Sequence, residues 1–150
     1  DEENSLVCRN AIFVRHDCAP QSPIEHDLVA ITVSAVYNLA MANHLWGIDH
    51  QCTSRLDIAV RHYELVLSLL KKDSTGLCRT PPMMSALNNM ATIHRVMSNE
   101  SKLIQNLQLL NMIMARVDPK DARRNERNWM IYMSNLTCLF LNPRITAKAA

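Results

Sequence analysis

The stretch Val36-Tyr37-Asn38-Leu39-Ala40 returns in related form as Leu87-Asn88-Asn89-Met90-Ala91 and as Met133-Ser134-Asn135-Leu136-Thr137. Its pattern is an apolar residue, any residue, asparagine, an apolar residue and a small residue. Each copy lies in a segment whose apolar residues recur at the spacing of an amphipathic helix. A second helical segment follows each of the first two copies. The sequence therefore predicts helical repeats, in which each unit buries its apolar face by stacking on a neighbour.

The composition of the chain also favours an all-α fold. The 150 residues include only two glycines, and aromatic residues make up only 5%, so leucine, methionine and alanine fill most apolar positions. These residues favour helix over sheet. The formal net charge of +2 gives no reason to expect binding to nucleic acid or to an anionic membrane surface.

The cysteines and the apolar segments bear on the location of the protein. The five cysteines are Cys8, Cys18, Cys52, Cys78 and Cys138, with wide spacing and no Cys-x-x-Cys motif. This pattern predicts thiols in a reducing intracellular compartment, cytoplasm or nucleus, with an organelle left open. A disulfide between Cys8 and Cys18 is the alternative that the sequence leaves open. The longest apolar segment, residues 28–45, is interrupted by polar side chains, so we expect no membrane span. The sequence begins at Asp1 rather than at methionine, and targeting cannot be read from it.

Prolines and capping residues set the expected boundaries. Ser22-Pro23-Ile24-Glu25 is a capping box that opens a helix to about Trp46, with Gly47 as its stop. Asn99 is expected to cap a later helix. The expected organisation is a non-helical arm (1–21), a helical-repeat domain (22–141) and a loose tail (142–150). The repeat domain divides into repeat one with a loop insertion (22–72), repeat two (80–117) and a capping helix (119–141). The arm could be an extended segment or a small hairpin.

The two helix pairs resemble tetratricopeptide repeats, in which large and small apolar residues at fixed positions of two helices interlock. In the second pair the matching residues are Leu87, Met90, Ala91 and His94, followed by Leu103, Leu107 and Leu110. In the first pair they are Val36, Leu39, Ala40 and Asn43, followed by Ala59, Tyr63 and Val66. The chain departs from the family at its tryptophan and glycine positions. Residues 37–44 are also similar to uncharacterised repeat proteins of unicellular algae. The resemblance implies a short, right-handed all-α repeat of about five helices.

The resemblance further implies a concave groove lined by the first helix of each repeat. With the recurrent asparagines, the predicted partner-binding residues are Tyr37, Asn38, Met41, His44, Asn88, Asn89, Thr92 and Arg95. Such a surface suits an extended peptide or a partner helix. An end face of the stack is the other expected docking place, for a partner protein or a second copy. The asparagines are open to two interpretations, a structural bond to main chain on a neighbouring helix or a ligand contact.

Other functions are less well supported by the sequence. His44, His50, Cys52 and His62 could form a metal- or small-ligand-binding cluster in a helical bundle, which is the alternative function, although no tight zinc motif encodes it. The basic residues between Arg116 and Arg127 alternate with acidic ones and predict a solvated face rather than an RNA site. No nucleophile elbow or glycine-rich phosphate loop occurs. We therefore expect an interaction or scaffold module that is not an enzyme, with no cofactor.

Overall fold

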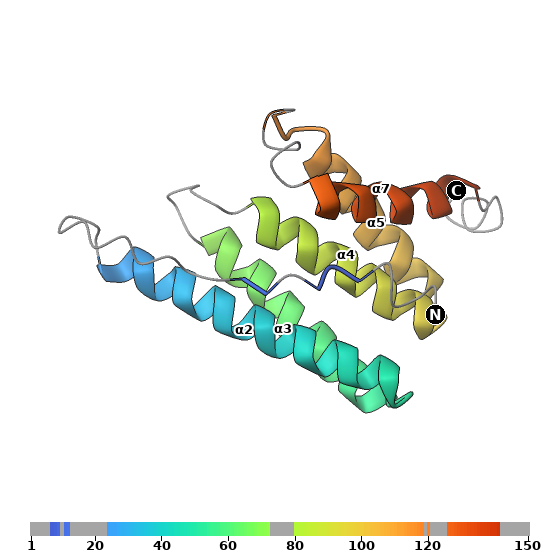
Figure 1. Ribbon diagram of the computed structural model, residues 1–150, viewed down its shortest axis with the longest axis horizontal. Helices are drawn as coiled ribbons and strands as arrows, with labels where there is room; N and C mark the ends of the chain where they lie inside the picture. Colours follow the sequence, from blue (N-terminus) through green and yellow to red (C-terminus); the bar gives the residue numbers. More distant parts are fainter. Residues whose placement is uncertain are drawn as a thin grey trace. The chain divides into compact units, whose positions relative to one another are not determined.

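The computed structural model describes residues 7–9, 11–12, 24–72, 80–118, 120 and 126–141. Within these ranges the regular structure is entirely helical (Figure 1). The helices are α2 (Ile24–Asp49), α3 (Thr53–Lys72), α4 (Thr80–Val96), α5 (Glu100–Met114) and α7 (Glu126–Leu141). They are arranged in antiparallel pairs, and the described part of the chain contains no strand. The predicted all-α class is confirmed for the described residues, among which five helices are defined.

The chain divides into two compact units. One unit covers residues 9–83 and contains α2 and α3 together with arm residues 9, 11 and 12. The other unit covers residues 1–8 and 84–150 and contains most of α4, all of α5 and α7, and arm residues 7 and 8.

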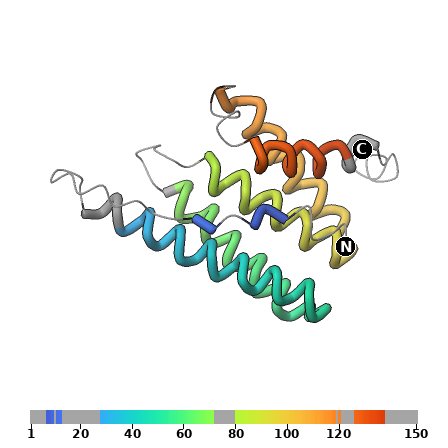
Figure 2. The backbone as a smooth tube through the Cα atoms, in the orientation of Figure 1, coloured from blue at the N-terminus to red at the C-terminus, as the bar shows by residue number. Residues whose placement is uncertain are grey.

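In the first unit, α2 and α3 pack against each other along their lengths (Figure 2). Helix α2 buries Val33, Tyr37, Ala40 and His44, which recur at the three- and four-residue spacing of one helix face. Helix α3 buries an equivalent stripe, made of Leu56, Ala59, Tyr63, Val66 and Leu70. The rings of Tyr37 and Tyr63 meet edge to face, with their centroids 5.6 Å apart. This favourable aromatic geometry fixes the two helices side by side.

The prediction that Gly47 ends the first helix is wrong, because α2 continues through it to Asp49. Gly47 is buried where the start of α3 comes close. A Cβ atom on residue 47 would lie 2.6 Å from Cδ2 of Leu56 and 3.2 Å from its main-chain nitrogen. The left-handed residue of the turn is Gln51, with φ of 50°. Glycine is therefore needed at position 47 for close helix contact and not for a turn.

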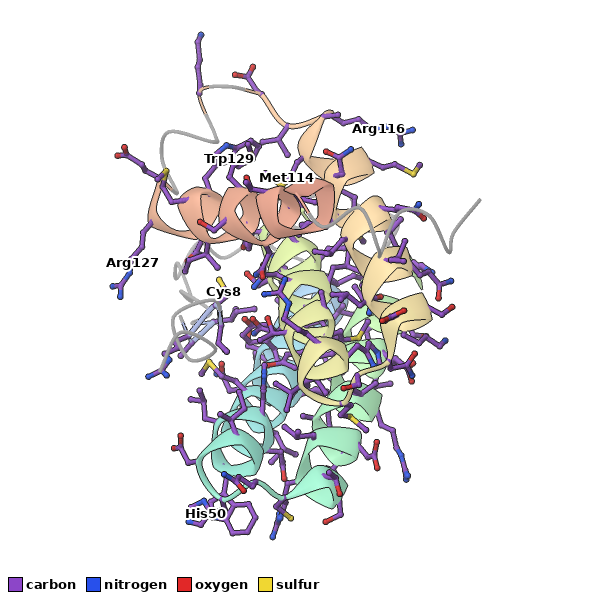
Figure 3. All side chains as sticks on the ribbon, turned by 90° about the vertical axis from the view of Figure 1, so that its right-hand side faces the viewer. Cys8, His50, Met114, Arg116, Arg127 and Trp129 are labelled. Atoms are coloured by element: carbon purple, nitrogen blue, oxygen red, sulfur yellow. The ribbon has the colours of Figure 1, made fainter. Side chains whose placement is uncertain are left out.

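In the second unit, α4 is buried along most of its length, since every residue from 84 to 94 is buried. Asn99 caps α5 as predicted, because its Oδ1 accepts a hydrogen bond of 3.3 Å from the N–H of Lys102. Helix α5 ends at Met114 and α7 begins at Glu126 (Figure 3). The predicted helix start at 119 falls where residues 119 and 121–125 lie outside the described set.

Helix α2 also bears on the expectation that the chain has no membrane span. By length and composition alone, Leu28–Asp49 could cross a membrane, and one third of the segment tested is buried. A core helix of a soluble protein meets the same criterion. The packing of Tyr37 and His44 on α3 favours the core interpretation, and the absence of a span stays a prediction.

Candidate functional site

The first recurrent asparagine, Asn38 on α2, binds the main chain of the N-terminal arm. Its Oδ1 accepts a hydrogen bond of 3.0 Å from the N–H of Ile12. Its Nδ2 donates a hydrogen bond of 3.1 Å to the carbonyl oxygen of the same residue. One side-chain amide thus satisfies both main-chain polar groups of Ile12.

The second recurrent asparagine, Asn89 on α4, does the same for Cys8. Its Oδ1 accepts from the N–H of Cys8 over 2.8 Å, and its Nδ2 donates to the carbonyl oxygen of Cys8 over 3.1 Å. Both residues are fully buried. A buried main-chain group without a partner costs about 1–3 kcal/mol, so this pairing contributes substantially to the docking of the arm.

The third recurrent asparagine, Asn135 on α7, contacts another side chain. Its Nδ2 donates to Oδ1 of Asn88 over 2.7 Å, and Nδ2 of Asn88 donates to Oδ1 of Asn89 over 3.3 Å. All three side chains are fully buried. The chain of amides fixes the orientation of Asn89, so that its oxygen faces the N–H of Cys8 and its nitrogen faces the carbonyl oxygen.

Cys8, which is labelled in Figure 3, is fully buried, and its side chain lies among polar groups of the second unit, here called the Cys8 pocket. Its Sγ lies 3.6 Å from Oγ of Ser85 and 3.7 Å from the hydroxyl oxygen of Tyr132. These two hydroxyl groups are hydrogen-bonded to each other over 2.8 Å. The three residues come from the arm, α4 and α7, so the pocket exists only when these segments are assembled.

On the first unit, the arm places a positive charge near a buried histidine. His44 is fully buried, and its ring lies edge-on to Tyr63 with the centroids 6.1 Å apart. Neither ring nitrogen has a hydrogen-bond partner among the described residues. Burial, and secondly the charge of Arg9, lower the pKa of His44 from 6.5 to about 3. His44 is therefore neutral at physiological pH.

The predicted binding residues fall into two groups. Tyr37, Asn38, Met41 and His44 lie on α2, and of these Tyr37 and His44 face the α2–α3 interior. Asn88, Asn89, Thr92 and Arg95 lie on α4. The Oγ1 of Thr92 donates to the carbonyl oxygen of Asn88 over 3.0 Å, and Arg95 is half-buried. In each group, the recurrent asparagine (Asn38 or Asn89) forms hydrogen bonds with the main chain of the arm.

Sequence reasoning missed four residues of the site, namely Cys8 and Ile12 in the arm, Ser85 on α4 and Tyr132 on α7. Cys8 and Ile12 belong to two short apolar runs in the sequence of the arm, Leu6-Val7-Cys8 and Ala11-Ile12-Phe13-Val14. These apolar runs precede the recurrent asparagines in the sequence. Their apolar character was the available signal that the arm packs on the helices. Ser85 and Tyr132 had no signal of their own, because each is an ordinary residue on the buried face of a helix.

The proposed metal cluster is not assembled in the described structure. No group of three or more histidine, cysteine, aspartate or glutamate side chains that could hold a metal occurs among the described residues. His50 stacks on Trp46 with their ring centroids 4.3 Å apart, and His62 Nδ1 lies 2.8 Å from the carbonyl oxygen of Ile58. A hydrogen bond with the Ser54 side chain lowers the pKa of the Cys52 thiol. Arg123 and Arg124 of the basic segment lie outside the described residues.

Comparison of the chain with known proteins gives no match to a family model, a curated protein or a solved structure. The similarity to tetratricopeptide repeats therefore rests on the residues that carry it in this sequence. Function has to be inferred from the contacts of the recurrent asparagines and of the segment that they hold.

Proposed function

We propose that this chain is a tetratricopeptide-like interaction module that holds an extended polypeptide segment by its main chain. The observation that carries the proposal is the identical pairing of Asn38 with Ile12 and of Asn89 with Cys8. Both asparagines occupy the same position of a repeated sequence phrase. Both use one oxygen and one nitrogen to bind the N–H and carbonyl of a single residue.

This mode of binding suits a polypeptide ligand. A side-chain amide has the same donor and acceptor as a peptide group, so it can pair with the main chain of any residue except proline. Main-chain pairing supplies affinity that does not depend on sequence, and side-chain pockets supply selectivity. The arm in residues 7–12 is the resident segment, and we propose that a segment of a partner protein binds in the same way.

The proposal is tested by exchange of the arm. A protease site is inserted between Gln21 and Ser22 of the full chain, which is then folded and cleaved. A fluorescent peptide with the sequence of residues 1–21 is added, and its binding is followed by anisotropy. We expect the labelled peptide to exchange with the resident one. Asn89→Leu should weaken binding about ten- to hundredfold, since two hydrogen bonds to the buried main chain of Cys8 are lost.

Matched variants separate this effect from a general loss of structure. Asn106→Leu makes the same change at another buried asparagine of the second unit, on α5. Asn43→Leu does so on α2, where Asn43 bonds to Leu39 and Arg55 and not to the arm. Peptide binding should survive both controls and weaken with Asn38→Leu and Asn89→Leu. Equal binding by all four variants would refute main-chain holding by the recurrent asparagines.

A further inference from the structure

We infer that the second unit selects partner segments with a small thiol or hydroxyl side chain at the residue that Asn89 holds, directly after an aliphatic residue. The ligand is then an extended segment of another protein that contains an aliphatic residue followed by cysteine or serine. This inference rests on the proposed function and specifies its ligand. The first observation behind it is the chemistry of the pocket that Cys8 fills.

The pocket offers matched polar partners. The hydroxyl groups of Ser85 and Tyr132 both lie within contact of the Cys8 sulfur, at 3.6 Å and 3.7 Å. These hydroxyl groups are also hydrogen-bonded to each other, and either atom of each pair could be the donor. A hydroxyl group donates one hydrogen bond and accepts up to two, so the pair can bond a thiol or hydroxyl group of the ligand. A methyl group can make neither bond, so it would lose both polar contacts of the Cys8 sulfur in a buried site.

The pocket also limits the size of the side chain. Cys8 and Tyr132 are fully buried, and Ser85 is 6% exposed. Ser85 and Asn89 lie one helical turn apart on α4, and the residue whose main chain Asn89 holds has its side chain in contact with Ser85. A leucine at this position would have to displace the Ser85–Tyr132 pair. Protein interiors are packed too densely to accept the extra atoms without strain.

The preceding residue adds a second selection. Val7 is only 2% exposed, so its aliphatic side chain is buried in the protein. A β-branched side chain favours an extended backbone at its own position, directly before the residue that Asn89 holds. A partner segment would need a comparable aliphatic residue, and it would compete with the arm because the two occupy the same pocket.

The test uses the cleaved full chain and four unlabelled peptides that compete with the labelled one. Each peptide carries residues 1–21 with Cys18→Ser, and position 8 is cysteine, serine, alanine or leucine. We expect cysteine and serine peptides to bind within about threefold of each other and the alanine peptide about five- to tenfold more weakly. The leucine peptide should bind at least about a hundredfold more weakly. Tyr132→Phe in the protein should shrink the difference between serine and alanine peptides and leave the alanine peptide bound.

The outcomes distinguish the two proposals. If all four peptides bind equally well while Asn89→Leu weakens every one, side-chain selection is wrong and main-chain holding stands. If no peptide binds the cleaved chain, although the chain keeps its helical circular dichroism, both proposals fail. An unchanged preference for serine over alanine in Tyr132→Phe and in Ser85→Ala would also overturn the assigned pocket, because the preference is assigned to the contacts of these two hydroxyl groups with the Cys8 sulfur.

Discussion

Asn135 and Asn88, separated by 47 positions in the sequence, are joined by a side-chain hydrogen bond of 2.7 Å in the interior of the second unit. The bond from Asn135 fixes the orientation of the Asn88 amide. Nδ2 of Asn88 in turn donates a hydrogen bond to Oδ1 of Asn89. Through this relay of hydrogen bonds, the third copy of the repeated phrase therefore contributes to the orientation of Asn89, the asparagine that binds the main chain of Cys8. The three hydrogen-bonded amides lie in a region where a polar group without a partner is costly.

The first prediction concerns this relay. Asn135→Leu should lower the free energy of unfolding by about 2–3 kcal/mol, because Asn88 loses its donor in a buried site. Asn106→Leu should be neutral or slightly stabilising, since Nδ2 of Asn106 has no hydrogen-bond partner among the described residues. Urea denaturation of both variants makes the comparison. Equal destabilisation by the two substitutions would contradict the relay.

The second prediction concerns the contact of α2 with the start of α3. Gly47→Ala should destabilise the protein by about 1–3 kcal/mol, because the new Cβ would collide with Leu56. In the Leu56→Ala background the added cost of Gly47→Ala should shrink, since the side-chain atoms at 2.6 Å and 2.9 Å are gone. Thermal unfolding of the four proteins in the double-mutant cycle measures this coupling. Strict additivity would mean that the predicted collision does not occur.

The third prediction concerns acid stability. The folded pKa of His44 is about 3, below the ordinary value of 6.5 in an unfolded chain. As the pH falls, His44 therefore takes up a proton in the unfolded state before it does so in the folded state. The free energy of unfolding has its full value above pH 6.5 and decreases progressively from pH 6.5 towards pH 3. The expected slope is about 1.4 kcal/mol per pH unit in this window. His44→Phe should remove this slope, whereas a change at the exposed His50, His50→Gln, should retain it. Parallel pH profiles for wild type and His44→Phe would exclude His44 as the cause.

The fourth prediction compares two thiols. Cys52 is partly exposed and its pKa is lowered by the Ser54 side chain, whereas Cys8 is fully buried. In a chain with Cys18, Cys78 and Cys138 changed to serine, Cys52 should react with a disulfide reagent much faster than Cys8. Asn89→Leu should accelerate only the slow phase, because it favours release of the arm. If Cys8 reacts as fast as Cys52 in the chain that retains Asn38 and Asn89, these asparagines do not hold the arm.

Local signals in the sequence predicted the helices well. Asn99 was identified as a cap because its side chain can bond an N–H one turn later, which depends only on neighbouring residues. Gly47 was misread because its role depends on Leu56, a residue of the following helix. Helix α2 carries no charge from residue 28 to 48, so its sequence could not show which face is buried.

The site was predictable only in part. The recurrence of asparagine marked the residues that hold the arm, because a repeated polar residue on an apolar helix needs a partner. The partner itself could not be read, since a main-chain N–H and carbonyl leave no trace in the sequence of the segment that offers them. The Ser85–Tyr132 pocket was equally hidden, because only the fold brings together residues 47 positions apart.

Amide hydrogen exchange at Cys8 and Ile12, measured by NMR on the full chain, tests the holding of the arm most directly. Both amides should exchange slowly in the wild type, because each donates to an asparagine oxygen. Asn89→Leu should accelerate exchange at Cys8, Asn38→Leu should accelerate exchange at Ile12, and Asn106→Leu should accelerate neither. Exchange of both wild-type amides at the rate of an unfolded chain would contradict main-chain holding by Asn38 and Asn89.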